Sequence, residues 1–89
     1  MESKPVARCP RRTVAAALRA CRRGEVVAAR APDGAALAVV RLTSGEVCVV
    51  ADRCPHDGGV LSDGFVEADR LVCARHHWEV DPRTGERIH

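Results

Sequence analysis

The chain has 89 residues, the size of one small domain, which buries a modest share of its surface and gains from a bound cofactor. Its cysteines form an odd, irregularly spaced set, which argues against a secreted disulfide framework. The set is Cys9, Cys21, Cys48, Cys54 and Cys73. No apolar run reaches the length of a membrane span or of a signal-peptide core, so we expect a soluble, cytoplasmic protein with no membrane partner.

The net charge of +2 hides an asymmetry along the chain. Residues 1–30 carry eight Lys/Arg and two Glu, whereas residues 31–89 carry six Arg and ten Asp/Glu. No aromatic side chain is interleaved with the N-terminal arginines to stack on bases, so we expect no nucleic-acid partner. Residues 1–12 are polar and contain two prolines, and we interpret them as a flexible basic arm before a single domain at residues 13–89.

A short amphipathic helix is predicted after the arm. Thr13 is a suitable N-cap and Gly24 a suitable C-terminal stop. One narrow apolar face follows the i, i+3, i+4, i+7 spacing of a helix. Its members are Val14, Ala17, Leu18 and Cys21. On such a face, Cys21 is predicted to be a small core residue.

Residues 25–51 predict a three-stranded antiparallel meander. Runs rich in Val and Ala are separated by turns at residues 32–34 and 43–45, each of which ends in Gly. Cys48 lies within the third run and is interpreted as a buried thiol that behaves as a small hydrophobe. A tight hairpin over residues 66–72 then brings Cys73 to the end of a strand.

Two short motifs carry the candidate chemistry. Cys54 and His56 form a C-x-H pair, Cys73 and His76 form a C-x-x-H pair, and sixteen residues lie between the two pairs. Zinc accepts two Cys and two His, although a single residue between Cys and His is unusual for a zinc knuckle. A two-iron, two-sulfur cluster with two Cys on one iron and two His on the other accepts the same four side chains. Two loops that each give one Cys and one His supply the second arrangement naturally.

The sequence around these pairs resembles the Rieske iron–sulfur family. "CPHDGG" at residues 54–59 is similar to the first cluster-binding loop, "LSDG" at 61–64 to the segment after it, and "HHWEVDPRTGE" at 76–86 to the second loop and its exit. The resemblance covers roughly residues 25–86. It implies an all-β fold: a Rieske-like antiparallel sandwich with a two-loop cluster subdomain at about residues 52–86, here preceded by the short helix. The chain ends at His89, before the closing C-terminal strands of the family, so we expect these strands to be absent, supplied by a partner or lost by truncation.

The resemblance also implies the role of each ligand. Cys54 and Cys73 would hold the buried iron of a [2Fe–2S] cluster, and His56 and His76 the outer iron. His77 would be a neighbour that does not ligate. The glycines after His56 would let backbone N–H groups approach the sulfides.

Three departures from the family pattern bear on loop stiffness and on reduction potential. Ala74 replaces a proline that stiffens the second loop in the family. Trp78 stands where high-potential members place a hydrogen-bonding Ser, and we interpret it as a packing plate. The chain also has no Tyr, so we expect a low-potential, ferredoxin-like protein.

Acidic residues crowd this half of the sequence. They are Asp57, Asp63, Glu67 and Asp69. We interpret them as the solvated surface of the cluster end rather than as a docking patch for a basic partner.

The implied function is one-electron transfer, with the chain as a carrier and not itself an enzyme. Its implied partners are a flavin-dependent reductase upstream and a terminal oxygenase, or a similar acceptor, downstream. Three alternatives stay open: a small subunit of an assimilatory nitrite reductase, a structural module that holds zinc or no metal, and a piece of a larger oxygenase.

Overall fold

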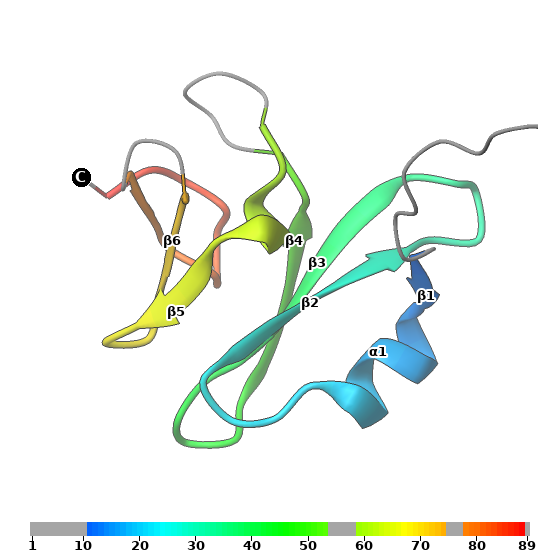
Figure 1. Ribbon diagram of the computed structural model, residues 1–89, viewed down its shortest axis with the longest axis horizontal. Helices are drawn as coiled ribbons and strands as arrows, with labels where there is room; N and C mark the ends of the chain where they lie inside the picture. Colours follow the sequence, from blue (N-terminus) through cyan, green and yellow to red (C-terminus); the bar gives the residue numbers. More distant parts are fainter. Residues whose placement is uncertain (1–10, 54–58, 75–77, 89) are drawn as a thin grey trace, which may run out of the picture.

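The computed structural model describes residues 11–53, 59–74 and 78–88, which fold into two small sheets and one helix. The element order is β1 (Arg12–Thr13), α1 (Val14–Ala20), β2 (Glu25–Arg30), β3 (Ala36–Arg41), β4 (Val47–Ala51), η1 (Leu61–Asp63), β5 (Phe65–Glu67), β6 (Arg70–Val72) and β7 (Glu79–Val80). The first sheet has the order β1-β2-β3-β4 and the second the order β5-β6-β7. Figure 1 shows α1 on one side of the first sheet and the second sheet on the other. The predicted all-β class, with one short helix, is confirmed.

The meander predicted over residues 25–51 is present as β2, β3 and β4. Val39, in the middle strand, pairs with Val27 on one side and with Val49 on the other, both antiparallel. Gly34 and Gly45 have φ values of 93° and 97° in the two connecting turns, a region that costs a residue with a Cβ atom strain. The turn glycines and the β-branched runs between them therefore set the register.

The first sheet has a different core on each face because its side chains alternate. Val39 points to the helix side, where it packs with the apolar face of α1. Its neighbours Ala38 and Val40 point to the other side, where they pack with residues of the second sheet such as Leu71 and Val80. The first sheet is therefore the middle layer, between the helix and the second sheet.

The helix begins as predicted and ends earlier than predicted. Thr13 is the N-cap, and its hydroxyl oxygen accepts a hydrogen bond from the Ala16 N–H at 3.2 Å. The helix ends at Ala20 rather than near Gly24, which has a φ of 80° in the following turn. Arg41 of β3 explains the early end: its guanidinium donates to the Leu18 and Cys21 carbonyls and so satisfies groups that a longer helix would have bonded.

The first strand was not predicted. Arg12 and Thr13 pair in parallel with the end of β2. The side chain of Arg11 also reaches into the fold, where it bonds Asp52. Residues 11 and 12, assigned to the flexible arm from sequence, thus belong to the folded part, while residues 1–10 lie outside the described residues. A two-residue strand has no periodicity that a sequence pattern could detect.

The second sheet is built on the predicted hairpin. Its turn residues, Ala68 and Asp69, have φ values of 52° and 60°, which is the two-residue geometry that matches the twist of a hairpin. Strand β7 then adds to β6, with Val80 opposite Leu71. Among the described residues no helix is long and apolar enough to cross a membrane.

Candidate metal centre

The first predicted cluster loop leaves the end of β4 and returns at η1, and a buried carboxylate joins its two sides. Asp52 accepts a hydrogen bond from the Ser62 N–H at 2.7 Å and another from the Ser62 hydroxyl at 2.6 Å. Cys54 follows Asp52 by two residues, and Ser62 lies in the segment after the loop. The pair therefore fixes the separation of the chain on either side of the first loop.

Arg11 balances the charge of this carboxylate. Its Nη1 lies 2.7 Å from Asp52 Oδ2, and the Asp52 side chain has no exposed surface. The same nitrogen also lies 3.4 Å from the carbonyl oxygens of Ala29 and Leu37. A buried polar group is tolerated when it is paired and hydrogen-bonded, and Asp52 meets this condition as the centre of a small polar network.

The second predicted loop is also closed at its base. The Cys73 N–H donates to the Trp78 carbonyl oxygen at 2.9 Å across the loop. Cys73 is 1 % exposed and belongs to the same apolar cluster as Leu61. Trp78 packs against that cluster, and the Arg87 guanidinium lies 3.6 Å from its ring centre. The packing role expected of Trp78 is confirmed.

Gly64 brings the two loop bases together. A methyl group on Gly64 would overlap the Val72 carbonyl oxygen and come within 3.2 Å of the Ala74 nitrogen. The chain that follows the first loop therefore lies in direct backbone contact with the chain that enters the second. Only a residue without a side chain permits this approach.

Of the four predicted ligands, the structure describes Cys73 alone. Cys54, His56 and His76 lie outside the described residues, as do His77 and Asp57. Cys73 is a free thiol at the end of a strand, beside the loop bases just described. Within the described part of the chain no three His, Cys, Asp or Glu side chains gather into a metal site.

Cys21 and Cys48 have the structural role predicted for them. Both are buried and free, and each lies within one of the two apolar cores. The Cys21 thiol also donates to the Glu25 carbonyl oxygen, 3.2 Å away. Burial raises the pKa of the Cys21 and Cys48 thiols, which opposes the thiolate form that binds metal.

The structure corrects the interpretation of the acidic residues. Glu67 and Asp69 lie at the turn end of the β5–β6 hairpin, whereas Cys73 follows the other end of β6. Asp69 accepts hydrogen bonds from the backbone N–H and the hydroxyl of Thr43, in the β3–β4 turn. Glu67 and Asp69 therefore do not belong to the cluster end, and Asp69 has a structural role.

The structure is a small domain of two β-sheets, in which the bases of two loops lie in backbone contact. One of these bases carries the buried Cys73. The family model for the Rieske [2Fe-2S] domain matches residues 12–89. The chain belongs to the Rieske [2Fe-2S] domain family.

One known protein is similar in fold, and another is similar in sequence over about half of the chain. The fold is similar to that of the ferredoxin of Sphingomonas yanoikuyae B1, with a TM-score of 0.71 and 30% identity over 81% of this chain and 70% of that one. A 4beta-methylsterol monooxygenase of Methylococcus capsulatus is 48% identical over 48 residues, which are 54% of this chain and 13% of that enzyme. The chain thus spans only a small part of that curated relative.

Family membership and the ferredoxin-like fold imply a [2Fe–2S] cluster and electron transfer as the function of this domain. The described residues fit that group because Cys73 is a buried, soft sulfur donor that is free of any disulfide. The cluster supplies one-electron redox chemistry when bound. The chain's part is to hold the cluster.

Proposed function

We propose that the chain carries single electrons on a Rieske cluster held by Cys54 and Cys73 on one iron and by His56 and His76 on the other. The observation that carries the proposal is the backbone contact at Gly64, because it joins the base of the loop with the first Cys–His pair to the base of the loop with the second. Four ligands on two loops with adjacent bases suit one compact cluster.

The partners that we propose are a flavin-dependent reductase as the donor and an oxygenase, or a similar redox enzyme, as the acceptor. The similarity to a ferredoxin over most of the chain supports the role of a carrier between proteins. We place this carrier in the cytoplasm. The three described cysteines, Cys21, Cys48 and Cys73, are all free thiols, which suits a reducing compartment.

A second candidate function is that of an electron-entry domain within a larger oxygenase. The local identity of 48% to a monooxygenase favours it. The two functions differ in the mass of the native protein and in its iron content. A carrier contains two irons for two acid-labile sulfides, whereas an oxygenase contains additional iron.

The test is a comparison of two cysteine variants after anaerobic purification. Cys73→Ala removes a proposed ligand, and Cys48→Ala removes a buried thiol of similar exposure that lies in the same core. We expect Cys73→Ala to lose iron, sulfide and the electron paramagnetic resonance signal of the reduced cluster, and Cys48→Ala to retain all three. A colourless wild-type protein that binds zinc, or an intact signal in Cys73→Ala, would overturn the proposal.

A further inference from the structure

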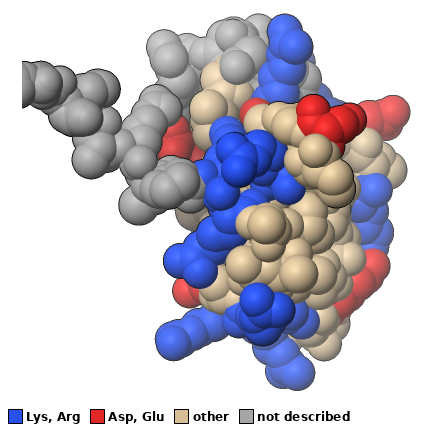
Figure 2. Space-filling model, turned by 90° about the vertical axis from the view of Figure 1, so that its right-hand side faces the viewer, with Lys and Arg blue, Asp and Glu red and all other residues tan. Residues whose placement is uncertain are grey.

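Five exposed arginines, on or next to β1, α1 and β2, form no ion pair with an acidic side chain of the described residues. We call them the arginine face, which consists of Arg12, Arg19, Arg22, Arg23 and Arg30. The ion pairs found within the described part of the chain use Arg11, Arg70 and Arg83 instead. Figure 2 shows blue side chains spread over this side of the protein, with red ones at its margins. Charges that no internal pair neutralises are available to an external partner.

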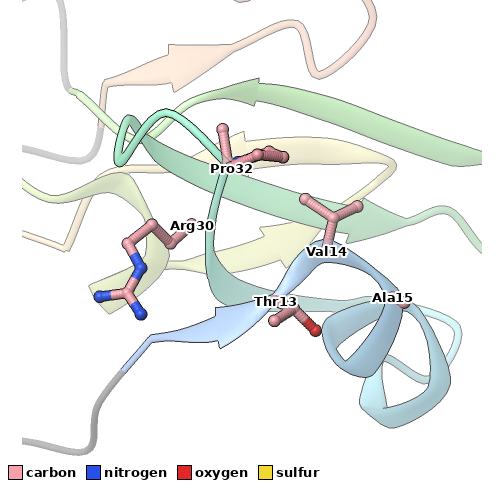
Figure 3. A pocket seen from close by; sticks show the side chains of 6 residues that line it. Thr13, Val14, Ala15, Arg30 and Pro32 are labelled. Carbon is pink, nitrogen blue, oxygen red and sulfur yellow. The ribbon is translucent and has the colours of Figure 1, made fainter.

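A hollow lies at one end of the arginine face, where Arg30 is part of its lining. The hollow has a volume of about 450 Å³ and lies between β1, the start of α1 and the β2–β3 turn. Its lining is Thr13, Val14, Ala15, Arg30, Ala31 and Pro32. Figure 3 shows Val14 projecting from the start of α1 and Pro32 from the β2–β3 turn, with the guanidinium of Arg30 extended away from both. An apolar floor with an arginine at its edge is the usual arrangement of a protein–protein contact site.

We propose that this hollow binds an acidic segment of a partner protein. One apolar side chain of the segment enters the hollow, and its neighbouring carboxylates bind Arg30 and the rest of the arginine face. Arginine suits this role because its guanidinium bonds a carboxylate through two parallel N–H groups.

Two other occupants suit the surface less well. A membrane surface requires an apolar helix face that points outward, and the apolar face of α1 is directed into the core through Ala17 and Cys21. Nucleic acid would use the arginines but not the apolar lining, since its phosphates and sugars place no alkyl side chain in a hollow.

The position of the arginine face indicates what binding of a partner there would do. Figure 1 shows α1 on the opposite side of the first sheet from β6, whose end leads into Cys73, and the β2–β3 turn at the end of that sheet. A partner held on the arginine face would leave the base of the second loop uncovered. The same copy could then stay tethered to one protein while it exchanges electrons with another. Binding itself does not depend on the proposed electron route.

The test uses the full-length, cluster-loaded protein and a short blocked peptide of alternating Glu and Leu, with a Glu–Ser peptide as its control. We expect peptide-induced amide chemical-shift changes at residues 13–15, 30 and 31, and much weaker binding of the Glu–Ser peptide. Arg30→Glu should weaken binding of the Glu–Leu peptide about tenfold or more. Arg83→Glu makes the same charge change at another exposed arginine, in the turn after β7, and should leave the affinity within about twofold.

A second variant separates the hollow from the charge around it. Ala15→Glu places a carboxylate in the hollow, and an acid in the first turn of a helix does not disturb its folding. We expect this variant to lose binding and to keep its thermal midpoint and iron content. Equal weakening by Arg30→Glu and Arg83→Glu, no effect of Ala15→Glu, or tighter binding to duplex DNA or anionic phosphatidylglycerol vesicles than to the peptide would each overturn the proposal.

Discussion

Asp52 and Ser62 are joined by two hydrogen bonds, one to each carboxylate oxygen, at 2.7 and 2.6 Å. They flank the first predicted cluster loop, and the carboxylate that joins them has no exposed surface. Arg11, which the family resemblance did not single out, supplies the opposite charge. The chain on either side of the first loop is thus tied to Arg11, the first of the described residues.

Asp52→Ala should therefore lower both stability and cluster retention. The change leaves the Arg11 charge and the Ser62 donors without their acceptor, which costs about 3 kcal/mol of unfolding free energy. Ser62→Ala removes only the hydroxyl bond and should cost about 1 kcal/mol. Urea unfolding and the iron content after gel filtration measure the two effects.

The exposed pair of Arg83 and Glu46 is the matched control for this prediction. Its side chains are about half exposed, so Glu46→Gln should change neither stability nor iron content measurably. If Glu46→Gln and Asp52→Ala behave alike, the buried network has no special part in holding the loop.

Gly64→Ala should also lower stability and cluster retention, because Gly64 lies where the bases of the two loops meet. The added methyl overlaps the Val72 carbonyl oxygen, so the two loop bases must move apart. We expect a loss of at least about 2 kcal/mol and weaker cluster retention. Gly34→Ala is the control: it has open space around it and should cost about 1 kcal/mol, from its φ of 93° alone, with normal iron content.

The sequence predicted the strongly patterned parts of this fold. The meander, its glycine turns and the hairpin before Cys73 all follow from alternation and turn chemistry that act within a few residues. Thr13 as an N-cap is equally local. These elements need no information from distant parts of the chain.

The parts that were missed depend on contacts between distant residues. Arg11 pairs with Asp52 across 41 positions, and no local pattern shows that this carboxylate is buried. The early end of α1 has the same origin, since Arg41 bonds its last carbonyls from another strand. For the metal site, the spacing of the Cys and His pairs was the signal, and Cys73 is the predicted ligand that the structure describes.

The hairpin turn offers a stabilising change. Ala68 has a φ of 52°, which costs a residue with a Cβ atom about 1 kcal/mol. Asn tolerates this conformation better, so Ala68→Asn should raise the unfolding free energy by about 0.5 kcal/mol. A lower thermal midpoint in Ala68→Asn would contradict this turn geometry. Asp69→Gly is the contrasting variant. Glycine relieves the backbone strain at this position, but the change also removes the hydrogen bonds that Asp69 accepts from Thr43.

The buried thiols of Cys21 and Cys48 should make the folded protein less stable at alkaline pH. Burial raises the pKa of Cys21 and of Cys48 in the folded state above that of the unfolded chain, which is about 8.5. Their contribution to the free energy of unfolding is therefore fully present below about pH 8.5. It is lost as the pH rises through the folded-state pKa, because the unfolded state releases its protons first. Thermal midpoints between about pH 7 and 10 should fall less steeply in Cys21→Ala/Cys48→Ala than in the wild-type protein. Parallel curves would show that these thiols do not govern the alkaline transition.

The adjacent histidines give the sharpest test of the proposed ligand set. His76→Ala should abolish the reduced-state resonance signal, whereas His77→Ala, a matched change one residue away, should keep both the signal and the iron content. His76→Cys should retain a cluster with a lower reduction potential and a shifted spectrum, because a thiolate adds negative charge that a neutral imidazole lacks. Loss of the signal in His77→Ala alone would move the ligand to His77 and change the second motif from C-x-x-H to C-x-x-x-H. Loss in both variants would instead assign the two histidines a joint role in holding the second loop.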